Sequence, residues 1–277
     1  IFWPLIAAWI GDGSQGEELL DQIGTFNIAF SIGMILGPLV AGWAMTKSVS
    51  SAIGFGILTS SFIILLLVMT KEPPLEEEDE WEPQVGGTSP YVYIGWLSNF
   101  ANFVAVGIIR ILFPKIGLSL GLSSFTIGIL FALFYFAWFV TFVVMMRFRS
   151  WQYRPIPLFT LQMVGLVGFL FLWRGSSLLT FALGFFLFGL CVGMTYFSSL
   201  FYCQNSESDK GHNAGYHETF LGAGMLIGPF FGGLIADYFT LQTPFFFCML
   251  IVGLTMVVQA YLLKRGSDFS MEGNLPL

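Results

Sequence analysis

Residues 131–146 read FALFYFAWFVTFVVMM, a run that contains no charged side chain. Its apolar residues are continuous, whereas a strand of a membrane β-barrel alternates apolar and polar side chains. A helix satisfies its backbone hydrogen bonds internally, so it is the form in which such a run can lie in lipid. The stretch therefore predicts a transmembrane helix.

Seven further runs have the same character, and about 20 residues are enough for a helix to cross a bilayer. The eight predicted spans are residues 26–44, 52–69, 91–113, 125–146, 156–173, 178–201, 219–235 and 244–263, and residues 1–10 are predicted to end an earlier span. The chain is 56% hydrophobic and 10% charged, whereas soluble domains carry about 25% charged residues. These features predict an all-α membrane protein.

The acidic balance of the chain, a formal charge of -6, comes largely from one segment. Seven of the 17 carboxylates lie within residues 72–82, in a Pro- and Glu-rich stretch that is typical of a flexible linker. There is no basic stripe, so a nucleic-acid partner is not predicted. The three cysteines have no paired spacing, and neither a metal site nor a cofactor is indicated.

The distribution of basic residues predicts the orientation. With loops numbered alternately, seven Lys and Arg residues fall on one side and four on the other. The richer side contains Arg147, Arg149 and Arg154, and the positive-inside rule makes it cytosolic. The acidic linker and the C-terminal tail are then predicted to be cytosolic as well.

An internal repeat joins two distant spans. Residues 33–42 read GMILGPLVAG and residues 224–233 read GMLIGPFFGG, at a constant offset of 191. Gly33, Gly37, Pro38 and Gly42 pair with Gly224, Gly228, Pro229 and Gly233. Glycines four apart allow close helix packing, and an internal proline bends a helix. Close packing alone would explain one copy, but two copies in register favour two homologous halves.

The repeat also predicts the domain organisation. Residues 1–70 are expected to be the remainder of an N-terminal six-helix bundle, and residues 71–90 the acidic cytosolic linker. Residues 91–263 are expected to form a C-terminal six-helix bundle, with a cytosolic tail at 264–277. By the same offset, about a hundred residues with three spans and most of a fourth are expected to precede Ile1.

The chain resembles the major facilitator superfamily in these features. Its two glycine–proline elements are similar to that family's motif in the fifth and eleventh spans. FWPLIAAWIGD at 2–12 followed by FNIAFSIG at 26–33 resembles the passage from the fourth span to the fifth. The resemblance implies a major-facilitator-like helical bundle, from the end of span four through spans five to twelve. The basic loop at 146–154 lacks the glycine and aspartate pattern of the family's gating loop, which favours membrane anchoring over gating for its arginines.

Polar side chains inside the spans are the candidates for a substrate pathway, because they are costly in lipid. Asn99, Asn102 and Arg110 lie within about 80° of one another around a helix, on one face. Asn27, Tyr135 and Tyr196 are weaker candidates for lining the same pathway. The alternative for all of them is hydrogen bonding or packing between helices.

These observations predict a secondary active or facilitative transporter of a small solute that works by alternating access. A non-transporting receptor that binds a partner is the alternative, and a membrane-embedded enzyme is less favoured because no catalytic groups converge. The expected partners are the solute and the bilayer of the plasma or inner membrane, with the protein acting as a monomer. Since Glu218 and Asp237 are expected to flank a span rather than lie within it, a coupling ion is left open.

Overall fold

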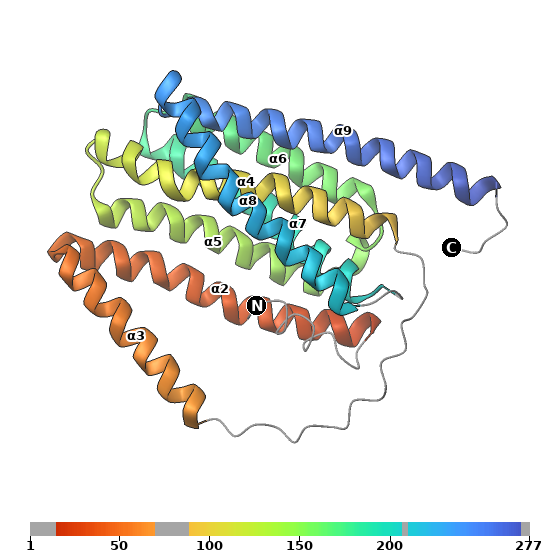
Figure 1. The fold of residues 1–277 in the computed structure, drawn as a ribbon, viewed down its shortest axis with the longest axis horizontal. Helices are drawn as coiled ribbons and strands as arrows, with labels where there is room; N and C mark the ends of the chain where they lie inside the picture. The colour runs from red at the N-terminus through yellow and green to blue at the C-terminus, as the bar shows by residue number, and fades with distance from the viewer. Residues whose placement is uncertain (1–14, 70–88, 207–209, 273–277) are drawn as a thin grey trace.

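The computed structural model describes residues 15–69, 89–206 and 210–272 (Figure 1). The helices are α2 (Gly16–Lys47), α3 (Val49–Met69), α4 (Pro90–Ser119), α5 (Ser124–Arg147), η1 (Arg149–Trp151), α6 (Pro155–Arg174), α7 (Leu178–Gln204), α8 (Lys210–Tyr238) and α9 (Thr243–Glu272). No strand occurs in these described ranges. The predicted partial span at 1–10 and most of the predicted linker lie outside them.

Within the described part of the chain, eight helices are long and apolar enough to cross a membrane, one for each predicted span. This confirms the predicted all-helical membrane fold. Several bounds differ from the prediction. α2 begins at Gly16 rather than at residue 26, α8 begins at Lys210 rather than at 219, and α9 continues to Glu272. Polar residues continue a helix beyond its apolar part, so hydrophobicity alone places the ends too close together.

The end of α4 also differs from the prediction. The predicted span ends at residue 113, but α4 continues through Pro114 to Ser119. Helices in membranes tolerate an internal proline because neighbouring groups satisfy the freed carbonyl. The chain turns at Gly121, whose φ of 77° suits glycine. Ser123 then caps α5 by accepting a hydrogen bond from the Thr126 backbone N–H at 3.0 Å.

The helices form a bundle from which α3 diverges (Figure 1). α4 packs against α7, α8 and α9, while α7 also contacts α5 and α6. α2 lies along α5 and connects to α3, which has no buried residue. One side of the bundle is formed by the ends of α5 and α7 and by the starts of α2, α4, α6 and α8. We call this side the basic end, because it carries Arg147, Arg149 and Arg154.

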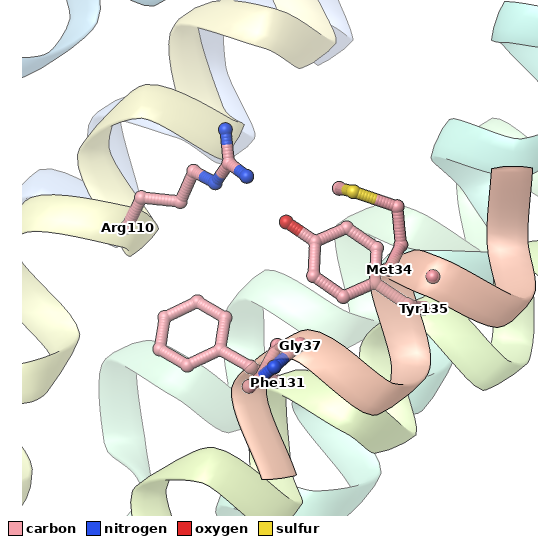
Figure 2. Close-up of a pocket in the computed structure, with 7 residues that line it drawn as sticks. Met34, Gly37, Arg110, Phe131 and Tyr135 are labelled. Atoms are coloured by element: carbon pink, nitrogen blue, oxygen red, sulfur yellow. The ribbon is translucent and has the colours of Figure 1, made fainter. Parts of the chain in front are cut away.

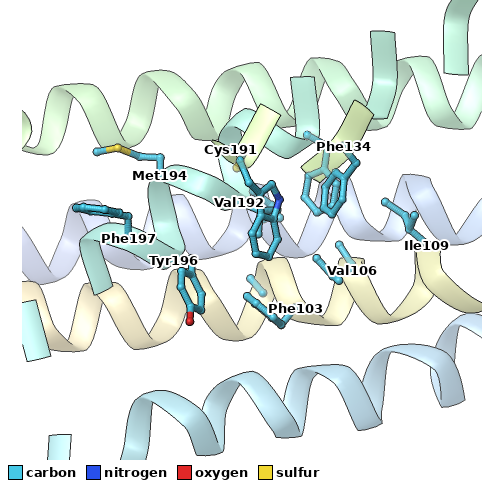
Figure 3. Packing of buried hydrophobic residues seen from close by; sticks show 14 of the residues in the cluster. Phe103, Val106, Ile109, Phe134, Cys191, Val192, Met194, Tyr196 and Phe197 are labelled. Carbon is cyan, nitrogen blue, oxygen red and sulfur yellow. The ribbon is translucent and has the colours of Figure 1, made fainter. Parts of the chain in front are cut away.

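The centre of the bundle is filled by aromatic side chains from α4, α5 and α7 (Figure 3). Phe103 of α4 lies edge-on to Trp138 of α5, with ring centroids 6.1 Å apart. Tyr196 of α7 stacks on Trp138 at 5.9 Å. Offset and edge-on ring pairs are favourable geometries, so this packing fixes the relative positions of the three helices.

The two glycine–proline copies have different neighbours in the structure. Gly42 packs against Ser124 and Gly128 of α5, whereas a Cβ at Gly33 or Gly37 would meet no other described helix within 4 Å. In the second copy the pattern is reversed. Gly224 and Gly228 pack against the backbone of α4, and Gly233 is open.

Gly228 therefore provides a test of the α4–α8 contact. Replacing Gly228 with alanine should lower the free energy of unfolding by about 1–2 kcal/mol, because the added Cβ would clash with the Val104 carbonyl oxygen. Gly233→Ala, on the same helix, should be neutral or slightly stabilising. Thermal unfolding in detergent measures both variants, and equal stabilities would contradict this account of the contact.

Candidate functional site

A cavity of about 370 Å³ lies between α2, α4 and α5 (Figure 2). Its lining residues are Gly33, Met34, Gly37, Pro38, Arg110, Phe131 and Tyr135. The glycines leave room on the α2 side because neither carries a side chain. Phe131 and Tyr135, one turn apart on α5, supply an aromatic wall. The cavity thus joins the first glycine–proline element to two of the predicted pathway residues.

Arg110 is the charged residue on the described wall of this cavity. Its guanidinium carbon lies 6.0 Å from the centre of the Tyr135 ring. Figure 2 shows the guanidinium and the phenol hydroxyl directed into the same space. A charge inside a span costs about 2.5–3.5 kcal/mol on insertion scales, so such residues usually serve a site. The pair offers a cation and a hydroxyl beside apolar surface.

Asn99 and Asn102, predicted to share a face with Arg110, lie in helix contacts instead of on this cavity wall. Asn102 donates from Nδ2 to Thr195 Oγ1 of α7 at 3.1 Å. Asn99 Nδ2 lies 3.2 Å from His217 Nδ1 of α8. Both asparagines are fully buried. Their present contacts match the alternative expectation of hydrogen bonding between helices.

Asn27 and Tyr196 are also buried rather than on the wall. Neither polar atom of the Asn27 side chain has a hydrogen-bond partner in the described part of the chain, and the same holds for Trp138 Nε1. Buried polar atoms are normally paired. Of these groups Trp138 lies beside the cavity wall, because its ring is 5.6 Å from that of Tyr135.

Comparison with known proteins decides the family. The family model of the Major Facilitator Superfamily matches residues 1–206 and again residues 95–270. The chain belongs to the major facilitator superfamily. The solved structure of the human organic anion transporter MFSD10 (TETRAN) is similar in fold, with a TM-score of 0.66 at 15% identity, over 92% of this chain and 67% of that one. No curated protein sequence gives a significant match.

The protein is therefore an integral, multi-pass membrane transporter, as the sequence predicted. Proteins of this superfamily are generally not enzymes, and they bind small solutes within the membrane. In the described part of the chain, no three His, Cys, Asp or Glu residues converge in a way that could hold a metal ion.

At the basic end of the transporter, α2 is tied to the rest of the bundle. Glu17 of α2 forms an ion pair with Arg149 of η1. The Gly16 backbone N–H donates to Asn205 Oδ1 at 3.0 Å, and Asn205 Nδ2 donates to the Tyr153 hydroxyl at 2.8 Å. This set of contacts, here called the basic-end latch, joins the first turn of α2 to η1 and to the end of α7.

The structure places one polar side chain elsewhere than the sequence predicted. Glu218 was expected to flank a span, yet it lies within the membrane-length helix Gly211–Tyr238. The segment before residue 219 contains no proline, and that absence was the available signal that the helix extends backwards.

Proposed function

We propose that this transporter moves a small organic anion by alternating access, with Arg110 and Tyr135 as its anion contact. The observation that carries this proposal is the position of Arg110 in a cavity with an aromatic wall. A guanidinium binds carboxylate, sulfonate or phosphate groups through paired N–H donors. Phe131 and Met34 supply apolar surface for the rest of such a solute. The name of the structural neighbour, an organic anion transporter, agrees with this assignment.

The domain organisation that we propose assigns α2 and α3 to one bundle and α4 to α9 to the other. The cavity lies where α2 of the first bundle faces α4 and α5 of the second. The basic-end latch crosses the same boundary, from Glu17 to Arg149. We propose that the basic end is cytosolic and that breaking the latch accompanies opening to that side, as rocking of two bundles requires.

Uptake into vesicles tests the transport function. We expect the purified full-length protein in liposomes to take up radiolabelled p-toluenesulfonate, a permanently charged aromatic anion, faster than protein-free liposomes. The alternatives predict other outcomes. Turnover of a membrane-embedded substrate would favour an enzyme, and inert vesicles with a ligand-dependent protein partner would favour a receptor.

The latch makes a prediction of its own. Ser31 is a buried residue of α2, 1% exposed. Arg149→Ala should raise the rate at which a maleimide reagent labels a cysteine placed at Ser31 from the cytosolic side, by about two- to fivefold. The effect is small because a largely exposed ion pair contributes roughly 0.2–1 kcal/mol, and Arg149 and Glu17 are 39% and 79% exposed.

The matched control is Arg147→Ala, which removes the same charge at the end of α5. Arg147 takes part in no ion pair found among the described residues. Its replacement should leave labelling at Ser31→Cys unchanged. Equal rates in the two variants would show that overall charge, and not the latch, determines access to this side.

A further inference from the structure

A buried polar cluster lies between α4, α7 and α8, separate from the Arg110 cavity. His217 of α8 is fully buried at its centre. Its Nδ1 lies 2.9 Å from Ser199 Oγ of α7 and 3.2 Å from Asn99 Nδ2 of α4. Its Nε2 has no hydrogen-bond partner in the described part of the chain, and it lies 3.9 Å from Glu218 Oε1.

Asn99 Nδ2 and Ser199 Oγ both lie within hydrogen-bond distance of His217 Nδ1. With the Asn99 amide oriented so that Nδ2 donates, Nδ1 is the acceptor and the neutral imidazole carries its hydrogen on Nε2, 3.9 Å from Glu218 Oε1. A second proton on Nδ1 would face the Asn99 amide donor. The group of the pair that can take up a proton in this arrangement is the Glu218 carboxylate.

Glu218 lies within a membrane-length helix, where a carboxylate charge is costly. Its side chain is 18% exposed, so a proton can reach the carboxylate. The basic group found within 4 Å of its carboxylate among the described residues is the His217 imidazole, which is neutral in this arrangement and does not balance the charge. An ionisable group in a span is expensive unless it is neutralised. A proton would neutralise Glu218 without any other change of partner.

The neighbouring elements bring other titratable groups toward the pair. From α7, the Tyr196 ring lies 5.4 Å from the imidazole, and Cys203 accepts a hydrogen bond from Trp96. α4 contributes the neutral Asn99. On α8 itself His212 contacts Tyr216. α9 carries Lys264 and Arg265 near the basic end. Among the titratable groups of these neighbouring helices, Tyr196 makes the direct contact with His217.

Tyr196 also links the pair to the substrate cavity. Its ring stacks on Trp138, and Trp138 contacts Tyr135 of the cavity wall at 5.6 Å. Tyr135 in turn faces Arg110. A continuous series of ring contacts thus connects Glu218 and His217 with the anion contact. Packed side chains of this kind can carry energetic coupling between two sites.

We propose that Glu218 is a proton-binding site, positioned by His217, and that its protonation is coupled to movement of the anion. The carboxylate takes one proton from one side of the membrane and becomes a carboxylic acid. It returns the same proton on the other side, after the anion has crossed with it. The coupling rests on the proposed function, whereas the proton site rests only on the geometry of the pair.

Infrared difference spectra test the proton site without a substrate. Between about pH 8 and about pH 5, the purified full-length protein should gain a carboxylic-acid C=O band that Glu218→Gln lacks. Glu18→Gln, which removes an exposed carboxylate of α2, should retain that band. His217→Gln should retain it with a shifted midpoint, because a positioning residue changes the titration and not the group. Identical spectra for the protein and Glu218→Gln would overturn the proton site.

Transport in liposomes tests the coupling. p-Toluenesulfonate carries no proton of its own. If one proton moves with it, a pH one unit lower outside the liposomes than inside should raise its accumulation up to about tenfold. Glu218→Gln should accumulate it independently of the gradient. If uptake by the unmodified protein does not depend on the pH gradient, the proposed coupling is wrong. No uptake at all would overturn the anion function and the coupling with it, while the infrared band would still decide the proton site.

Discussion

Replacing Arg110 with glutamine should lower the affinity for p-toluenesulfonate by about tenfold. Hydrogen bonds to charged groups contribute roughly 1.5–3 kcal/mol, and each 1.4 kcal/mol is about tenfold in affinity; because Arg110 is exposed, we expect the lower end of that range. In the structure Arg110 supplies the cationic charge on the described wall of the cavity. Its loss leaves the sulfonate beside Tyr135 and apolar side chains. Isothermal titration in detergent measures the affinity directly.

Two further measurements separate recognition by Arg110 from a general effect of charge. Lys115→Gln removes a cation from the same helix, outside the cavity lining, and should change the affinity less than twofold. The neutral p-toluenesulfonamide has nearly the same shape and should bind the unmodified protein weakly and Arg110→Gln no worse. Equal losses in Arg110→Gln and Lys115→Gln would contradict the assignment of the anion contact. Arg110→Lys should recover part of the affinity, since a lysine keeps the charge without the paired donors.

The fold could be predicted because lipid limits the choices. A continuous apolar run such as residues 131–146 has no alternative to a helix there, and α5 spans it as expected. The ends could not be predicted in the same way. The residues from Lys210 to Glu218 are polar, so hydropathy assigned them to a loop, although they begin α8. Helix ends depend on backbone capping and neighbours, which hydropathy does not describe.

The candidate site was predicted only in part. The spacing of residues along a helix shows which side chains share a face, but it does not show which other helix that face contacts. Helical spacing puts Asn99 and Asn102 on one face of the helix, but α4 contacts α7, α8 and α9 along its length. The asparagines therefore meet α7 and α8, while Arg110, further along, meets the cavity beside α2 and α5. Likewise Gly33 and Gly224 are equivalent in sequence and differ in what they touch. Only the packing of distant segments decides such contacts.

Phe185 of α7 should be among the most sensitive positions for stability. It is fully buried, and its ring lies edge-on to Phe113 at 4.5 Å and to Phe131 at 5.2 Å. Lipid is as apolar as the interior of the helix bundle. The cost of Phe185→Ala therefore comes from lost packing rather than from exposure to water. A cavity on the order of 100 Å³, at roughly 24 cal/mol per Å³, lowers the free energy of unfolding by about 2–3 kcal/mol.

Phe230→Ala is the matched control, because that ring is 65% exposed on α8 and should lie against lipid. Thermal unfolding in detergent should place Phe185→Ala several degrees below the unmodified protein and leave Phe230→Ala within about one degree. Phe185→Leu should fall between them, since it refills part of the space. Because Phe131 is both a neighbour of Phe185 and a wall of the cavity, Phe185→Ala should also weaken binding of p-toluenesulfonate. A variant that loses stability but keeps full affinity would show that the aromatic wall holds its position without support from α7.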